Sequence, residues 1–264
     1  MNPERVERAT RAVIEAPTRG GLLRRDTRVI ERPGWYQLVT PSSQSAHLNE
    51  VVLSALPEAD AERAIDEAIA TYHPLGIPVK WCVGPWTEPS DFGARLERRG
   101  FKSWEVRGMG CDAALPLAAS REVEMHEVVT DDDLDEYLTA MMQGWSVAAD
   151  QHAFFRASIE DELRRESCAA HLWVARIGGR TAGTTGLLMR SDYGYFVGAQ
   201  VLDWARGRGV YRALLRARLD RLCDLGVDLA VTQARESTSA PMLEHLGFTT
   251  LLRSRCYLLE PPAR

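Results

Sequence analysis

The chain lacks the sequence features of several large classes of protein. None of its apolar runs approaches the ~20 residues that a membrane-spanning helix needs. Its N-terminus has no basic segment followed by an apolar one, which is the pattern of a secretory signal. Its net charge is −5, whereas a general nucleic-acid binder normally shows a basic excess. We therefore expect a cytoplasmic protein whose partners include neither a membrane nor a nucleic acid.

Cysteine is scarce and widely spaced. No two cysteines form a C-x-x-C pair, and the chain shows no serine or cysteine nucleophile motif. Scattered thiols with mostly apolar neighbours predict small core residues in a reducing compartment, with no disulfide framework, zinc site or other bound metal. The five cysteines are Cys82, Cys111, Cys168, Cys223 and Cys256.

What the chain does contain is an internal repeat. With 264 residues, 45% of them hydrophobic, it can bury the core of one large domain or two smaller ones. Each half shows a helix, Leu-Gly, a strand, a loop, and a short helix that ends in Gly-Phe. The alternative is that Leu-Gly and Gly-Phe are ordinary punctuation between elements. The landmarks fall at 61–72, 75–76, 77–83 and 91–101 in the first half, and at 210–225, 225–226, 227–232 and 239–248 in the second.

The most informative segment lies before the second of these long helices. A strand expected over residues 194–201 leads into a turn with Arg206, Gly207, Arg208 and Gly209, which opens the helix. The first amides of a helix have no internal partner and favour an anion. Glycine lets a phosphate approach the main chain, and arginine adds positive charge. The segment predicts a phosphate site, the alternative being a solvated helix start.

This order of elements resembles the GNAT superfamily of acetyl-CoA-dependent N-acyltransferases. The phosphate loop of that family reads [Gln/Arg]-x-x-Gly-x-[Gly/Ala], and Arg206 and Gly209 match its first two defined positions. Tyr211 stands at the third, where a small residue is usual. The Leu-Gly-Phe ending at Phe248 is also typical of the family, and the resemblance covers about the last 140 residues.

The resemblance implies an α/β fold with two GNAT-like units in tandem, each a mixed, mostly antiparallel sheet flanked by helices. We expect a degenerate unit at 1–115, a linker at 116–120 and a coenzyme-binding unit at 121–264. In the first half the segment 56–61 stands where the phosphate loop would be. It has Glu58 and Asp60 but no glycine, so a diphosphate there would meet like charge. The first half should therefore hold no coenzyme.

The resemblance also implies which residues bind the coenzyme, acetyl-CoA or another acyl-CoA. The pantetheine arm would pair with the main chain at the end of the 194–201 strand, as an added strand would. The diphosphate would sit on the loop and the start of the following helix. The implied contacts are Ala199, Gln200, Val201, Arg206, Gly207, Arg208, Gly209, Val210, Tyr211 and Arg212.

The sequence offers one candidate for the acid of the reaction and one for the base. The family often has a tyrosine four residues before the Gly-Phe glycine, and this chain has Leu243 there. Tyr211 could donate a proton to the leaving thiolate, or could pack in the core. Glu236 could accept the amine proton if a cleft raised its pKa, or could compensate a helix dipole.

The expected activity is transfer of an acetyl or other acyl group to an amine of a small molecule, an amino acid or a peptide by direct attack. One alternative is a non-catalytic acyl-CoA sensor, and another is altered chemistry such as decarboxylation or transfer from a carrier protein. Residues 141–145, with two methionines and a tryptophan, could line the acceptor cleft or pack as helix core. The protein is expected to be a monomer or a homodimer.

The remaining elements follow from periodicity, turn residues and capping. Thr130 or Asp131 should cap a helix. Further helices are expected at 3–16 and 154–165, hairpins at 27–32 with 35–40 and at 171–177 with 181–189, and strands at 121–129, 249–254 and 256–259.

Overall fold

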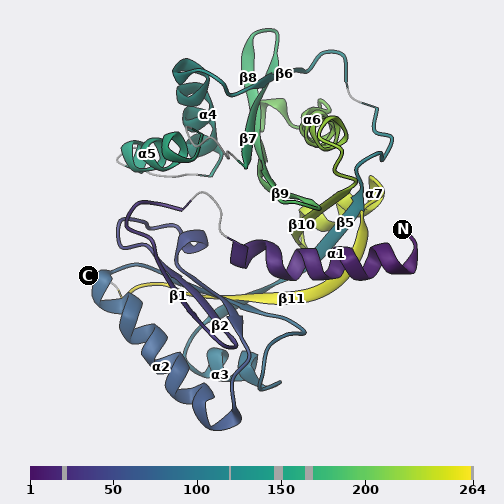
Figure 1. Cartoon of the computed structure of the whole chain (residues 1–264). Helices are drawn as coiled ribbons and strands as arrows, with labels where there is room; N and C mark the ends of the chain where they lie inside the picture. The colour runs from purple at the N-terminus through teal and green to yellow at the C-terminus, as the bar shows by residue number, and fades with distance from the viewer. Residues whose placement is uncertain (20–22, 119, 146–150, 164–168, 263–264) are drawn as a thin grey trace. The chain divides into compact units, whose positions relative to one another are not determined.

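A computed structural model describes residues 1–19, 23–118, 120–145, 151–163 and 169–262 (Figure 1). Its contacts divide the chain into two compact units. Unit 1 comprises Met1–Val13, Met109–Gln233 and Glu244–Thr249. Unit 2 comprises Ile14–Gly108, Ala234–Leu243 and Thr250–Arg264. This division by contacts differs from the one expected around 116–120, because each unit takes a segment from the other end of the chain. Residue 119 of the expected linker lies outside the described residues.

Unit 1 is built on a mixed sheet with the strand order β10-β9-β8-β7-β6. All neighbours are antiparallel except β9 and β10, which are parallel. Helices α4 and α6 both pack on β7, β8 and β9, from opposite sides of these strands (Figure 1). The bounds are β6 Glu124–Glu127, β7 Ala170–Ile177, β8 Arg180–Met189, β9 Gly194–Val201, β10 Leu229–Arg235, α4 Asp131–Gly144 and α6 Val210–Asp224.

In unit 2 the strands β1-β2-β3-β4-β11 are hydrogen-bonded in that order. Neighbouring strands are antiparallel except β3 and β4. Trp81 lies at the centre of the core, with ring centroids of Trp35 and Phe92 at 5.4 and 5.1 Å. The bounds are β1 Arg28–Arg32, β2 Trp35–Val39, β3 Glu50–Ser54, β4 Val79–Val83, β11 Thr249–Leu259, α2 Ala61–Tyr72 and α3 Phe92–Arg98.

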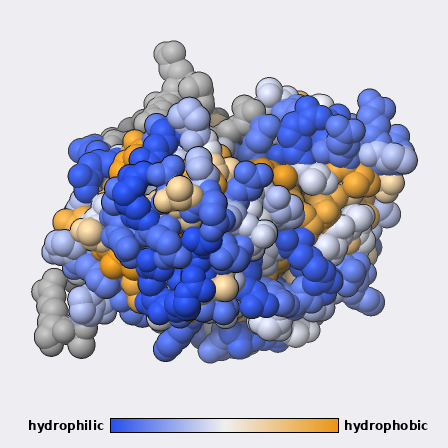
Figure 2. Space-filling view, turned by 90° about the horizontal axis from the view of Figure 1, so that it is seen from below, coloured by the Kyte–Doolittle hydropathy of each residue, from blue (hydrophilic) through white to orange (hydrophobic). Residues whose placement is uncertain are grey.

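The other elements complete the two halves. They are α1 Pro3–Glu15, α5 His152–Leu163, α7 Ser239–His245 and β5 Lys102–Asp112. The face of the molecule in Figure 2 is largely hydrophilic, with hydrophobic residues gathered in smaller areas. Among the described residues, no helix combines the length and the apolar character needed to cross a membrane.

The repeat predicted from the sequence is present in the order of elements. The first half runs β3, a 3-10 turn, α2, β4, α3 and β5, and the second runs β9, a 3-10 turn, α6, β10, α7 and β11. In each half the long helix connects two parallel, hydrogen-bonded strands. The four matched landmarks therefore reflect one supersecondary unit that occurs twice, in agreement with the predicted α/β fold of two units in tandem.

Several expectations need correction. The two last strand candidates form one strand, β11, because Ser254 is buried between the outward side chains of Arg253 and Arg255 and keeps the alternation going. The strand expected from residue 77 begins at Val79. Cys223 is exposed at the end of α6 and is not a core residue, whereas Cys82, Cys111 and Cys256 are buried and reduced. Cys168 and residues 164–165 of the expected helix lie outside the described residues.

Candidate coenzyme site

The turn between β9 and α6 in unit 1 is open and exposed. A short 3-10 turn, Asp203–Ala205, is followed by Arg206–Gly209, all exposed to solvent. Gly207 and Gly209 have φ angles of 76° and 80°, a left-handed conformation that suits glycine. A Cβ at Gly207 would meet nothing within 4 Å, and one at Gly209 would lie 3.1 Å from Ser120 Cβ. A ligand could therefore reach the main chain here.

The start of α6 offers hydrogen-bond donors to such a ligand. No side chain caps the helix, whose N-cap is Gly209. The amides of Val210, Tyr211 and Arg212 are among those that have no carbonyl to bind within the helix. Together with the helix dipole they attract an anion. The sequence folds this way because an N-cap glycine lacks the side-chain oxygen that serine or aspartate would supply.

The arginines of the turn keep their charged ends at the surface. Arg206 is 72% exposed and contacts Asp203 at 2.7 Å. Arg208 is 43% exposed and lies 3.7 Å from Glu122. Surface ion pairs of this kind contribute little and rearrange readily, so both guanidinium groups are available to a phosphate.

Trp204, just before the turn, marks the edge of a surface cavity of about 380 Å³ in unit 1. The guanidinium of Arg180 lies 4.2 Å from its ring centroid and that of Arg208 lies 5.7 Å away. The cavity is also lined by Glu136, which Arg176 Nε and Thr181 hydroxyl already bind at 2.9 and 2.5 Å. The negative charge of Glu136 is thus largely compensated.

Strand β9 leaves part of its edge unpaired toward β10. The parallel pairing joins Gly194–Phe196 to 230–232 and ends there, while β9 continues to Val201. On the other side β9 pairs with β8, with a bulge where Gly198 adopts a φ of 61°. A bulge bends the strand and increases its twist. The main chain of Ala199, Gln200 and Val201 therefore lies beyond the pairing with β10, and we call this unpaired region between the two strands the wedge.

Polar groups around this wedge are buried and incompletely bonded. The Gln200 side chain donates to the Ala140 carbonyl at 2.6 Å and to the Thr184 hydroxyl at 3.1 Å, but its Oε1 has no partner within the described chain. The same holds for the hydroxyl of Thr185, which faces the bulge. Buried polar atoms are normally satisfied, so these two stand out, and Gln200 Oε1 lies beside Gly144 of α4.

The two candidate catalytic residues lie in different surroundings. Burial raises the pKa of Tyr211, although Arg218 opposes this, so its phenol is neutral at pH 7 and can donate a proton. Glu236 belongs to unit 2, where Arg107 binds both of its oxygens and Arg253 Nη1 lies 2.7 Å away. Hydrogen bonding by Arg107 lowers the pKa of Glu236 to about 2. The expected rise of this pKa is therefore wrong.

Other residues considered from the sequence have structural positions. Leu243 is buried in α7, so the place of the usual tyrosine is filled by core packing. Met142 is buried, whereas Trp145, which follows α4, is 45% exposed. The segment 141–145 is thus partly core and partly surface.

Sequence reasoning missed Arg218 and the bulge at Gly198. Arg218 is 2% exposed and stands on the apolar stripe of α6, seven positions after Tyr211. An arginine on a stripe that otherwise reads Leu215, Leu219 and Leu222 was the available signal.

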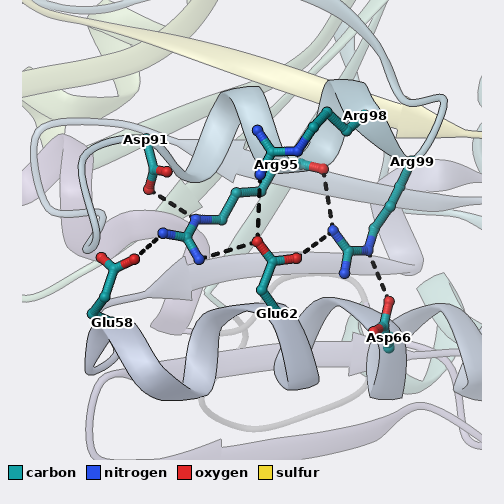
Figure 3. Close-up of polar contacts among 7 residues, drawn as sticks. All are labelled: Glu58, Glu62, Asp66, Asp91, Arg95, Arg98 and Arg99. Atoms are coloured by element: carbon teal, nitrogen blue, oxygen red, sulfur yellow. Dashed lines mark hydrogen bonds and ion pairs between the residues drawn. The ribbon is translucent and has the colours of Figure 1, made fainter.

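The first half differs from this site in the turn before its long helix and in the edge of the preceding strand. Its counterpart of the phosphate loop is the 3-10 turn Glu58–Asp60, and Arg95 of α3 contacts both Glu58 and Glu62 (Figure 3). At the end of β3 the carbonyl of Ser54 accepts from the amide of Glu88 at 3.1 Å, and the amide of Leu56 donates to the Glu88 carbonyl at 3.0 Å. The main chain of Glu88 thus pairs with the end of β3, whereas the corresponding end of β9 stays unpaired toward β10.

Comparison with known proteins shows what the chain is similar to. Residues 131–248 match the model of the acetyltransferase (GNAT) family. No curated protein matches the chain in sequence. A GCN5-related N-acetyltransferase from Kribbella flavida superposes with a TM-score of 0.66 at 14% identity, over 97% of this chain and 96% of that one. A tandem GNAT protein from the clavulanic acid biosynthesis pathway gives 0.55 at 15% identity, over 96% and 89%.

A conserved protein of unknown function from Staphylococcus epidermidis has a TM-score of 0.72 at 12% identity, over 90% of this chain and 95% of that one. Likeness at these identities concerns the fold and extends over both halves. Residues 131–248 are thus similar to the GNAT family, and the fold class predicted from the sequence, two GNAT-like units in tandem, is confirmed. This similarity supports acyl transfer in general terms.

Proposed function

We propose that the β9–α6 site binds acetyl-CoA or another acyl-CoA and transfers the acyl group to an amine of a small molecule, an amino acid or a peptide. One observation carries the proposal: the unpaired edge of β9 leads within a few residues to the uncapped start of α6. That arrangement presents a main-chain edge for an amide-bearing arm next to an anion site.

The residues would share the work as follows. The amides of Val210, Tyr211 and Arg212 would hold the diphosphate, with Gly207 and Gly209 giving access and Arg206 and Arg208 adding charge. The main chain of Ala199, Gln200 and Val201 would pair with the pantetheine arm. The neutral phenol of Tyr211 is the candidate acid for the departing thiolate.

Glu236 is a poor candidate for the base. A carboxylate whose pKa is about 2 holds a proton weakly and accepts one from an amine less readily than an ordinary glutamate does. Direct attack needs the amine in its neutral form, and positioning it beside the thioester supplies much of the rate.

We also propose that residues 1–115 carry no coenzyme site. Support comes from the carboxylates of the Glu58–Asp60 turn and from Glu88, whose main chain occupies the edge of β3. Like charge and a filled edge both oppose a diphosphate with its pantetheine arm.

Calorimetric titration with CoA tests the site. Gly207→Asp places a carboxylate in open space, at a φ that aspartate tolerates, and should weaken binding by about tenfold or more, ~1.4 kcal/mol. Gly226→Asp is the matched control, because Gly226 ends the same helix with a φ of 71° and nothing within 4 Å of an added Cβ. Equal affinities for the two variants would contradict the assignment.

A second function, a non-catalytic acyl-CoA sensor, is favoured by the buried Leu243 at the usual tyrosine position. Thiol release from acetyl-CoA with a panel of amines separates the two. Release with any amine supports the transferase. Tight binding of acetyl-CoA without release by any amine supports the sensor.

A further inference from the structure

Arg218 is a buried cation without a counter-ion. It is 2% exposed, its Nε donates to the Leu214 carbonyl of its own helix at 3.1 Å, and its guanidinium hydrogen-bonds the side chain of Tyr211. Nη2 has no hydrogen-bond partner, and no ion pair involves this residue, in the part of the chain that the structure describes. Burial lowers its pKa to about 10, so the group stays charged at neutral pH. A buried charge is costly unless it is paired, so the position needs an explanation.

Two other buried arginines meet carboxylates. Arg107 binds Glu236, and Arg95 contacts Glu58, Glu62 and Asp91. Arg218 differs from these two in having no carboxylate partner among the described residues.

The guanidinium of Arg218 lies at the point where β9 and β10 separate. Its central carbon is 4.2 Å from the ring centroid of Phe196, the last β9 residue paired with β10. The hydroxyl of Thr232 donates to the Phe196 carbonyl at 3.0 Å and closes the paired part. Tyr137 of α4 interacts electrostatically with Arg218, and its hydroxyl would lie 3.8 Å from a Cβ at Gly198. The charge is thus at the apex of the wedge.

The diphosphate of the coenzyme would not reach this charge. Arg218 is eight residues beyond Val210 along α6, which is about 12 Å at 1.5 Å per residue. The pantetheine arm between them carries no charge. Of the coenzyme, only the acyl group at the far end of the arm would reach the apex.

We propose that Arg218 binds a carboxylate at the end of the acyl group, so that the preferred donor is the CoA monothioester of a dicarboxylic acid. The inference rests on the proposed function, since it needs an acyl-CoA in the wedge. Phe196 would hold the guanidinium by stacking, and the free Nη2 would donate to the carboxylate.

The transfer step itself is unchanged by this assignment. The amine nitrogen bonds to the thioester carbon, the carbon–sulfur bond breaks, and the proton lost by the amine ends on the CoA thiolate. The distal carboxylate keeps its charge throughout, paired with Arg218.

A length-matched pair of ligands tests the inference by calorimetry. Succinyl-CoA and butyryl-CoA have acyl chains of the same length and differ in the terminal carboxylate. The wild-type protein should bind succinyl-CoA at least about tenfold more tightly than butyryl-CoA. In Arg218→Met this preference should disappear while the affinity for CoA changes little. Arg216→Met is the control on the same helix, because Arg216 is 39% exposed and pairs with Asp220.

The outcomes distinguish the inference from the proposed function. Failure of CoA itself to bind would contradict the proposed function. Binding of CoA with equal affinities for succinyl-CoA and butyryl-CoA would overturn the inference alone, as would a preference that persists in Arg218→Met. If Arg218→Met does not fold, the wild-type ratio decides, and Arg218→Lys, which keeps the charge, should retain part of the preference. If a carboxylate matters only on amino-acid acceptors, with acetyl-CoA as the donor, the anion belongs to the acceptor. That result would also overturn the inference.

Discussion

At the scale of single residues, most buried charged side chains of the described residues form ion pairs. In unit 2 Lys80 and Glu50, 6% and 7% exposed, form an ion pair at 2.8 Å, and His47 Nδ1 lies 3.0 Å from Lys80 Nζ. The charge of Lys80 lowers the pKa of His47 to about 3, so this imidazole is neutral at pH 7. Arg218 departs from this rule, and the departure falls in the proposed coenzyme wedge.

Glu236 gives a prediction with a definite sign. Its pKa is about 2 in the folded protein, below the usual 4.5, mainly because Arg107 hydrogen-bonds it. A lowered carboxyl pKa stabilises the fold above about pH 4.5, and this contribution is lost as the pH falls toward 2. Glu236→Gln should therefore lower the free energy of unfolding at pH 7 and have a much smaller effect near pH 2. Urea denaturation at both pH values measures this, and equal effects would contradict it.

Residue-scale features were predictable to unequal degrees. Gly207 and Gly209 could be read as an open turn, and both have positive φ. The environment of Glu236 could not be predicted, because Arg107 is far away in sequence and contacts Glu236 only in the folded unit. The bulge at Gly198 depends on the register between β8 and β9, which a single strand does not encode.

At the scale of elements, α4 shows how a local signal becomes structure. Asp133 N donates to the Thr130 hydroxyl at 3.2 Å, and the Thr130 amide donates to the Asp133 carboxylate at 2.9 Å, which forms a capping box. The sequence predicted a cap at Thr130 or Asp131. Thr130→Ala should lower the free energy of unfolding by about 0.5–2 kcal/mol. Urea denaturation of the two proteins checks this. Thr130→Ser, which keeps the hydroxyl, should retain most of the stability.

Helices α2 and α3 are joined by a network of ion pairs (Figure 3). Arg95 contacts Glu58, Glu62 and Asp91, and Arg99 Nε lies 2.8 Å from Asp66. These arginines lower the pKa values of Glu62, Asp66 and Asp91, chiefly through hydrogen bonds. The stabilisation is thus present above the ordinary carboxyl pKa values and lost as the pH falls below them.

Arg95→Met should destabilise the protein at pH 7, and less so at pH 3 or in high salt, because screening and protonation already weaken the network. Thermal unfolding across pH and salt concentration measures the effect. Arg98→Met is the control, since Arg98 is 59% exposed and lies 3.4 Å from Glu62. A larger loss for Arg98→Met than for Arg95→Met would contradict the role given to Arg95.

Most elements were predictable because their signals are local. Periodicity, glycine at helix ends and capping residues predicted α2, α4, α6 and both hairpins close to their observed bounds. β11 was predicted as two strands, 249–254 and 256–259, separated at Arg255. Only the pairing of Arg255 with Val83 of β4 shows that the strand is continuous.

At the scale of the whole molecule, the two compact units are not the two halves of the sequence. Arg5 of α1 pairs with Asp112 at 2.9 Å and with Asp228 at 2.6 Å, which ties the first helix to unit 1. Such pairings join residues more than a hundred positions apart, so composition around 116–120 could not reveal them. The repeat itself was predictable because its landmarks recur in order along the chain.

The proposed difference between the halves predicts one CoA per chain. Calorimetric titration should give a stoichiometry of one, because only the second half has the open turn and the unpaired edge. Glu58→Ala should leave the CoA affinity unchanged. A stoichiometry of two, or an affinity that changes with Glu58→Ala, would show that the first half takes part in binding.

The main-chain bonds of Glu88 bear on how such a site could be regained. Even a first half rewritten with glycines and arginines at 56–61 would still have Glu88 hydrogen-bonded to Ser54 and Leu56 along β3. A diphosphate could then bind at the turn, but the pantetheine arm would find the edge of β3 already hydrogen-bonded to Glu88. A coenzyme site in the first half would therefore require remodelling of the loop that contains Glu88 as well as of residues 56–61.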